Sequence, residues 1–203
     1  MRKYDIAYTL GQIIIGLASF WKPTKVYGLE NFPEGPALIC ANHVHNSDPF
    51  YIVTSFPRRD RVWIMAKEEI SHWPVVGPLL SWFGFLIWVK RGKSDVGAVK
   101  SALKALKGGE KLLIFPEGTR NEELGEGKTG AAMMAIRAKV PILPVHISGE
   151  RGFLTRVKVR IGQPYLPFTE DRKATAEDYQ RATDALMEKI RALGEEDRRE
   201  ALP

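Results

Sequence analysis

Short apolar runs alternate with amphipathic segments through most of this chain, and that alternation limits the folds it can adopt. Each apolar run has the length of a buried strand, and each amphipathic segment has the spacing of a helix that buries one face. Such alternation predicts an α/β fold in which helices flank a mostly parallel central sheet, with functional residues where the strands end. The predicted strands cover 37–41, 61–66, 85–90, 111–115, 141–148 and 157–164, the last being antiparallel or at an edge. The predicted helices cover 48–56, 96–106, 129–139 and 175–193.

The first 22 residues differ from the rest, because no charge occurs between Asp5 and Lys22 and apolar residues recur there at helical spacing. As a helix, this uncharged run would reach about 24 Å, less than the roughly 30 Å of a bilayer's hydrocarbon core. Basic and aromatic residues near its ends favour a helix that lies in or dips into one membrane leaflet; packing on the protein's own core is the alternative. We therefore expect a membrane-associating helix at 1–22, an α/β domain at 23–193 and a frayed polar tail at 194–203.

A second uncharged run covers residues 73–88 and contains three tryptophans. Pro74 and Pro78 argue against one membrane-spanning helix, since proline breaks a helix interior. The run is either ordinary core or the wall of an apolar groove that touches lipid.

Two of the four histidines, His43 and His45, stand just before Asp48 and Pro49. Positions five apart in a helix lie about 140° apart around its axis, so His43 and Asp48 can meet only if His43 lies in a loop before the helix. Pro49 favours a helix that begins there. Asp48 could then accept a hydrogen bond from one imidazole nitrogen, leaving the other to take a proton from a hydroxyl. The alternatives are His45 as the partner, a helix cap with surface histidines, and a metal site that lacks an obvious third ligand.

A second candidate site is the sequence FPEGTR at 115–120, where an apolar strand ends in a sharp turn. Arg120 can bind a phosphate through two parallel hydrogen bonds, and backbone N–H groups around Gly118 would add donors. A turn with a surface ion pair is the alternative. The nearby GEGKTG at 125–130 is not a P-loop, because its first required glycine would fall on a glutamate.

The net charge of +6 and the pI near 9.4 suggest an anionic partner: phospholipid headgroups, a phosphorylated metabolite, an acidic carrier or nucleic acid. Nucleic acid is disfavoured, since the basic residues form no clear stripe interleaved with exposed aromatics. The single cysteine, Cys40, excludes an internal disulfide and a cysteine-based zinc cage. Its position in an apolar run predicts a buried side chain. A chain that can form no internal disulfide is expected in a reducing, cytoplasmic compartment.

Four motifs resemble those of the glycerolipid acyltransferases, in the same order and at similar spacing. NHVHNSDPF at 42–50 looks like their motif of His, four intervening residues and Asp. GFLIWVKRG at 84–92 is similar to the second motif, FPEGTR matches the third letter for letter, and VPILPVHISG at 140–149 resembles the fourth. The resemblance covers roughly residues 20–165, and size and pattern point to the lysophosphatidate (1-acyl-glycerol-3-phosphate) acyltransferases.

This resemblance implies a glycerol-phosphate acyltransferase-like fold and transfer of a fatty acyl group to the free hydroxyl of lysophosphatidate, giving phosphatidate. The donor would be acyl-carrier protein or acyl-CoA, and direct attack on its thioester would need no cofactor and no metal. His43 would be the general base, and Asp48 its orienting partner. The protein would be peripheral or monotopic, at the membrane surface on the cytoplasmic face of the cell membrane. The residues implied to shape the acceptor site are Lys67, Arg91, Glu117, Gly118, Thr119 and Arg120, with Arg91 and Arg120 on the phosphate.

The chain departs from the family's usual pattern in two ways. It is short, and its second motif ends in Lys90-Arg91, so that either residue could bind the phosphate. The acceptor therefore remains open, with glycerol-3-phosphate or another lysolipid as alternatives. Two other classes of protein compete: a non-catalytic lipid-binding or carrier-binding protein with this fold, and a His- or metal-dependent hydrolase of lipid esters or thioesters.

Overall fold

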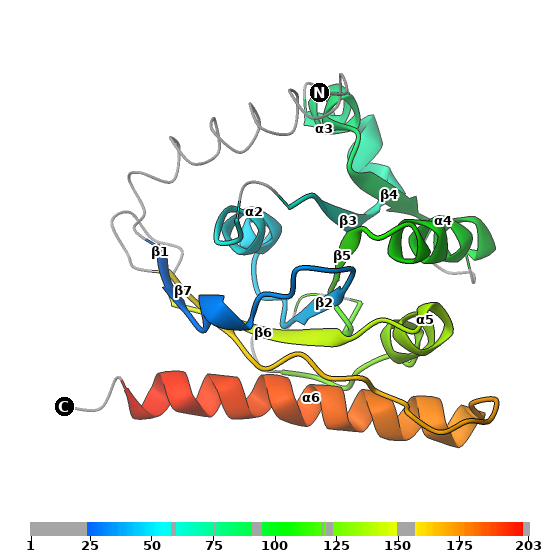
Figure 1. The fold of residues 1–203 in the computed structure, drawn as a ribbon. Coiled ribbons are helices and arrows are strands. Elements are labelled where there is room, and N and C mark those ends of the chain that lie inside the picture. The colour runs from blue at the N-terminus through cyan, green and yellow to red at the C-terminus, as the bar shows by residue number, and fades with distance from the viewer. Residues whose placement is uncertain are drawn as a thin grey trace.

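The computed structural model describes residues 24–57, 60–74, 76–90, 95–118, 120, 124–149 and 157–200. They form a seven-stranded sheet with the order β1-β7-β6-β2-β5-β3-β4 and helices on both faces (Figure 1). All neighbouring strands are parallel except β6 and β7. The strands are β1 (Thr24–Tyr27), β2 (Leu38–Ala41), β3 (Val62–Lys67), β4 (Leu86–Val89), β5 (Lys111–Ile114), β6 (Ile142–Ser148) and β7 (Val157–Ile161). The predicted α/β fold with a mostly parallel sheet is confirmed.

The described residues form α-helices and two short 3-10 helices. The α-helices are α2 (Asp48–Thr54), α3 (Val76–Phe83), α4 (Val96–Lys107), α5 (Gly130–Ala138) and α6 (Ala176–Arg199), and the 3-10 turns are η2 (Leu29–Asn31) and η3 (Glu68–His72). Figure 1 shows α2 on one side of the sheet and α6 running along the other side, below β6. Within the part of the chain that the structure describes, no helix combines the length and apolar character needed to cross a bilayer.

The central strand β2 shows how the sequence builds both faces of the sheet. Leu38 and Cys40 belong to a core cluster with residues of α4, α5 and α6, whereas Ile39 and Ala41 belong to a second cluster with residues of α2. Because helices cover both faces, all four side chains are apolar and fully buried. Burial raises the pKa of the Cys40 thiol well above its usual range, as expected for an unreactive core cysteine.

The six predicted strands and four predicted helices are all present. Strand β1 was not predicted, because its four residues, TKVY, are too few and too polar to show a periodic pattern. It pairs with β7, which is antiparallel to β6 as expected but lies inside the sheet. The run at 73–88 divides into α3 and β4, with a half-exposed Trp73 and a buried Ile87, so it is neither a single helix nor uniformly core. The helix expected at 1–22 lies outside the described residues.

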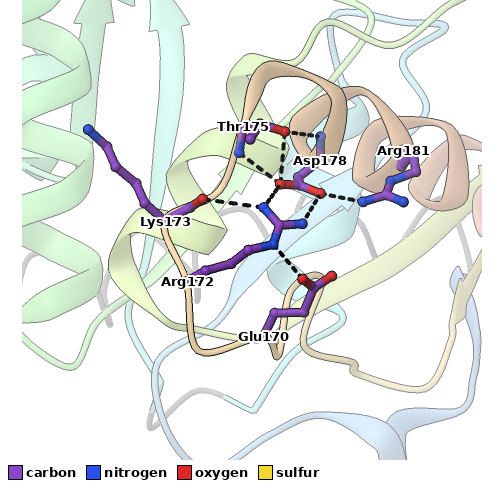
Figure 2. A network of polar contacts seen from close by, with 6 residues as sticks. All are labelled: Glu170, Arg172, Lys173, Thr175, Asp178 and Arg181. Atoms are coloured by element: carbon purple, nitrogen blue, oxygen red, sulfur yellow. Dashed lines mark hydrogen bonds and ion pairs between the residues drawn. The ribbon is translucent and has the colours of Figure 1, made fainter.

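A capping box and a buried carboxylate fix the start of α6 (Figure 2). The backbone N–H of Thr175 donates to Asp178 Oδ2 at 2.8 Å, and the Asp178 N–H donates back to Thr175 Oγ1 at 3.3 Å. Arg172 donates two hydrogen bonds to Asp178, at 2.6 and 2.9 Å, and also pairs with Glu170, while Arg181 approaches Asp178 from the next turn. The Arg172 guanidinium and the Thr175 N–H hold the pKa of the Asp178 carboxyl well below its usual range.

Helix α6 continues to Arg199, beyond the predicted end at 193, because its last turns are joined to the sheet. Asp197 is 5% exposed and accepts hydrogen bonds from His146 Nδ1 at 3.1 Å, Ser148 Oγ at 2.7 Å and Arg160 Nε at 3.0 Å. The prediction of a frayed tail from 194 onward is therefore wrong for residues 194–199. A composition-based boundary cannot detect a buried ion pair that forms only in three dimensions.

We expect Asp197 to make the free energy of unfolding depend on pH in acid. Burial disfavours its charge, but hydrogen bonds from His146, Ser148 and Arg160 outweigh burial and lower its pKa from 3.8 to about 2. Because the pKa in the folded state lies below that in the unfolded state, the ionised carboxylate contributes about 2 kcal/mol to the free energy of unfolding above pH 4. This contribution is lost as the pH falls toward 2. Urea unfolding of wild type and Asp197→Asn between pH 3 and 7 measures it. The difference in unfolding free energy between wild type and Asp197→Asn should shrink as the pH falls.

The control for this measurement is Asp184→Asn, because Asp184 is an exposed carboxylate on the same helix whose partner is Gln180. Its unfolding free energy should follow that of wild type at every pH. A stability difference for Asp197→Asn that stays constant down to pH 3 would contradict the assignment.

Candidate active site

The loop between β2 and α2 is fixed to a neighbouring strand at its first residue. Asn42 is 7% exposed; its Nδ2 donates to the Ile147 carbonyl at 3.0 Å, and its Oδ1 accepts from the Ile147 N–H at 2.8 Å. Two reciprocal hydrogen bonds to β6 thus determine where the chain leaves β2. This contact sets the starting position of the next residue, His43.

His43 and Asp48 meet in the way that the sequence requires, with His43 in the loop and Asp48 as the first residue of α2. Asp48 is fully buried, and its Oδ2 lies 3.2 Å from His43 Nδ1. The same oxygen accepts the backbone N–H groups of Val44 and His45, each at 2.7 Å. Three donors favour the ionised carboxylate. A carboxylate at Nδ1 holds the ring proton there, so that Nε2 of the neutral imidazole carries the lone pair.

The competing partner, His45, contributes only its backbone N–H to Asp48, and its side chain is exposed. His43, in contrast, is held on two sides. Its ring stacks on Phe115 with centroids 4.0 Å apart and planes 21° apart, and its side chain is 18% exposed. The imidazole is therefore oriented by packing and by Asp48, while part of it remains accessible.

Glu117 connects the His43 loop to the turn after β5 and to the segment that follows. It is 3% exposed, its Oε1 accepts the His43 N–H at 3.3 Å, and its Oε2 accepts the Gly125 N–H at 2.9 Å. The sequence indicates a carboxylate here but not these two partners, because they are backbone groups and one of them is 74 residues away. Glu117 thus fixes the His43 loop, the turn after β5 and the segment at Gly125 relative to one another.

Gly118 occupies a position that requires glycine. Its φ is +68°, and a Cβ there would lie 3.0 Å from Lys128 Nζ. Its N–H donates to the Phe115 carbonyl at 3.0 Å, which closes the turn. The anion donors expected among the backbone N–H groups around Gly118 therefore do not include that of Gly118 itself, because the turn uses it.

Arg120 reaches the same loop as His43, since its Nη1 donates to Asn46 Oδ1. Lys67 is half-buried at the carboxyl end of β3, the strand beside β5. The predicted residues Arg91 and Thr119 lie outside the described residues. The structure therefore gathers His43, Asp48, Glu117, Gly118 and Arg120 after the neighbouring parallel strands β2 and β5.

Sequence reasoning missed three residues of this site. Asn42 and Phe115 are the first residues of two recognised motifs, so their position was a usable signal. Lys128 lies in a glycine-rich stretch with no signal of its own. Chemically, the site combines an oriented imidazole with cationic side chains, which suits proton abstraction beside an anionic group. No group of three or more His, Cys, Asp or Glu that could hold a metal ion occurs among the described residues.

A model of the acyltransferase family matches residues 23–148, a range that contains the whole site described above. The chain therefore belongs to the acyltransferase family. It is 30% identical to a chloroplastic 1-acyl-sn-glycerol-3-phosphate acyltransferase of Brassica napus, over 72% of this chain and 45% of the relative. It is 32% identical to the 1-acyl-sn-glycerol-3-phosphate acyltransferase of Pseudomonas aeruginosa, over 62% of this chain and 50% of the relative.

The fold is also shared with a solved structure. The crystal structure of the 1-acyl-sn-glycerophosphate (LPA) acyltransferase PlsC from Thermotoga maritima aligns with a TM-score of 0.67 at 24% identity, over 96% of this chain and 84% of that chain. The present chain spans about half the length of the curated relatives that it matches.

Proposed function

We propose that this protein transfers a fatty acyl group from an acyl thioester to the free hydroxyl of 1-acyl-glycerol-3-phosphate, giving phosphatidate. The observation that carries the proposal is the His43–Asp48 pair, 3.2 Å apart, with Arg120 bonded to the same loop in a chain of the acyltransferase family. The names of the curated relatives support the choice of acceptor. The donor would be acyl-carrier protein or acyl-CoA.

In the proposed reaction, the hydroxyl oxygen of the acceptor attacks the thioester carbonyl while His43 Nε2 takes the hydroxyl proton. A C–O bond forms, the C–S bond then breaks, and the leaving thiolate takes the proton back from His43. Asp48 keeps the other ring proton on Nδ1 and stabilises the transient imidazolium. General-base assistance of this kind contributes about 10²- to 10⁴-fold.

The acceptor's phosphate would be bound by Arg120, with Lys67, Arg91 and Thr119 as further contributors. A guanidinium suits this role because it presents two parallel donors to phosphate oxygens. Asn46 holds the Arg120 guanidinium without neutralising its charge, since the amide oxygen is uncharged. Glu117 would shape the site indirectly, by holding the loops that carry the base and the guanidinium.

We also propose that the protein works at the cytoplasmic face of the cell membrane as a peripheral or monotopic protein. A lipid acceptor must be taken from a membrane, and a net charge of +6 favours an anionic surface. The half-exposed Trp73 is a residue type that is common at membrane interfaces.

The test of this function is to incubate the purified protein with labelled acyl-CoA or acyl-carrier protein and a panel of acceptors. The panel contains lysophosphatidate, glycerol-3-phosphate and lysolipids with blocked phosphates, and the ester formed is identified. Phosphatidate, formed only when lysophosphatidate is present, is the expected product. Free fatty acid released without acceptor would indicate a hydrolase, and an unconsumed donor would indicate a non-catalytic binding protein.

Arg120→Ala should raise the apparent KM for lysophosphatidate about tenfold and change kcat less, because the lost contact binds the phosphate before and during the reaction. Steady-state kinetics with each substrate varied in turn measures this. The KM for the acyl donor serves as the internal control and should stay near its wild-type value. An unchanged KM for lysophosphatidate would remove Arg120 from the phosphate site.

A further inference from the structure

The segment 124–129 crosses the turn after β5, and contacts at three of its residues hold it there. The Gly125 N–H donates to Glu117 Oε2 at 2.9 Å, and the Lys128 N–H donates to the Pro116 carbonyl at 2.9 Å. Between them, a Cβ at Gly127 would lie 2.8 Å from the Met187 side chain on α6, so this position has room only for glycine. The backbone of Lys128 is therefore fixed relative to the FPEGTR turn.

The side chain of Lys128 lies directly over Gly118. A Cβ at Gly118 would be 3.0 Å from Lys128 Nζ and 3.3 Å from both Cδ and Cε. Lys128 is exposed, and among the residues that the structure describes its ammonium has no hydrogen bond or ion pair. A lysine stem that lies over the turn, with an ammonium that is unpaired among the described residues, suits an anionic ligand.

The charges around this turn indicate what that ligand is. Two of the nearby carboxylates, Asp48 and Glu117, accept backbone N–H groups and are almost fully buried. Glu126, an exposed carboxylate of the same segment, forms no ion pair with Arg120 or Lys128. Arg120 donates to the neutral amide of Asn46. The positive charges of Arg120 and Lys128 are thus not offset by an ion pair among the described residues, and both sit at the same turn. A doubly charged anion such as a phosphate monoester complements two such cations.

We propose that Lys128 is a second phosphate ligand of the acceptor site, acting with Arg120 on the phosphate monoester of lysophosphatidate. The identity of that acceptor rests on the proposed function. The roles of the two cations differ: Arg120 supplies a planar pair of donors, whereas Lys128 supplies a compact charge on a flexible stem. Gly118 has no side chain, and this leaves the space over the turn to the Lys128 stem.

The first experiment measures binding without turnover. Short-chain lysophosphatidate, below its micelle-forming concentration, is titrated calorimetrically into His43→Ala and into His43→Ala combined with Lys128→Ala. The added substitution should weaken binding about tenfold, since one charge-assisted contact is lost. Lys128→Arg in the same background should bind within about threefold of the parent. The matched control is Arg137→Ala, which removes one exposed positive charge from the last turn of α5 and should leave binding unchanged.

The second experiment measures kinetics in the otherwise unaltered protein. Lys128→Ala should raise the KM for lysophosphatidate about tenfold with kcat within about threefold of wild type. A large fall in kcat at unchanged KM would place the ammonium on the reacting carbonyl and overturn the proposal. Unchanged lysophosphatidate binding in Lys128→Ala would overturn it as well. Binding that depends on Lys128 in a protein that forms no phosphatidate would uphold this inference and refute the proposed function, so the two failures are distinguishable.

Discussion

Replacing His43 with alanine should lower kcat at least a hundredfold while the protein stays folded. The imidazole is the group whose Nε2 is left to accept a proton, and general-base assistance is worth about 10²- to 10⁴-fold. The side chain is partly exposed, so its removal empties little of the core. The measurement is kcat with saturating acyl donor and lysophosphatidate, accompanied by circular dichroism and thermal unfolding.

The control for this prediction lies two residues away. His45→Ala removes an exposed imidazole and keeps the backbone N–H that bonds Asp48, so its kcat should stay within about twofold of wild type. His43→Gln keeps a side chain that can bond Asp48 but supplies no base, so it should be as slow as the alanine variant. Turnover near the wild-type rate in either His43 variant would refute the assignment of the base.

Replacing Asp48 with alanine should affect stability and turnover together. The fully buried carboxylate accepts the N–H groups of Val44 and His45 at 2.7 Å, and its loss leaves both donors without this partner. We expect the free energy of unfolding to fall by about 3 kcal/mol, because a buried unsatisfied donor costs about 1–3 kcal/mol. Turnover should fall by at least a hundredfold, since the imidazole loses the group that fixes its tautomer and orientation. Urea unfolding and steady-state kinetics measure the two effects.

Asp48→Asn separates the two roles of this residue. The amide oxygen can still accept both backbone N–H groups, so much of the stability should be retained relative to alanine. The neutral amide cannot stabilise the imidazolium that forms during proton transfer, so kcat should still fall strongly. An asparagine variant with wild-type kcat would show that Asp48 only holds the loop.

The fold was predictable from the sequence because most of its strands are apolar runs and its helices are apolar on one face. The run ALICA became β2, and the alternation of its side chains between two core clusters follows from the strand's period of two. β1 was not predictable, since its pairing with β7 joins residues 133 positions apart, beginning with Thr24 and Val157. The length of α6 also depended on a distant contact, between Asp197 and the residues His146, Ser148 and Arg160.

The candidate site was predictable where neighbours in sequence meet and not where distant segments do. Pro49 indicated that a helix begins at the end of the His43 loop, and this placed His43 and Asp48 together. The bond from Arg120 to Asn46 spans 74 residues and has no local signal. The position of Lys128 was the least predictable, because it depends on backbone hydrogen bonds to the turn after β5 and on a close approach of Gly127 to α6.

The buried carboxylate of Glu117 has a consequence for how substrates reach this site. It joins the loop that carries His43 to the turn that leads to Arg120, so neither can swing away without breaking a hydrogen bond in a place shielded from water. We therefore expect the catalytic geometry to be preorganised before any substrate arrives. The ordering entropy would then be lost during folding rather than in each turnover.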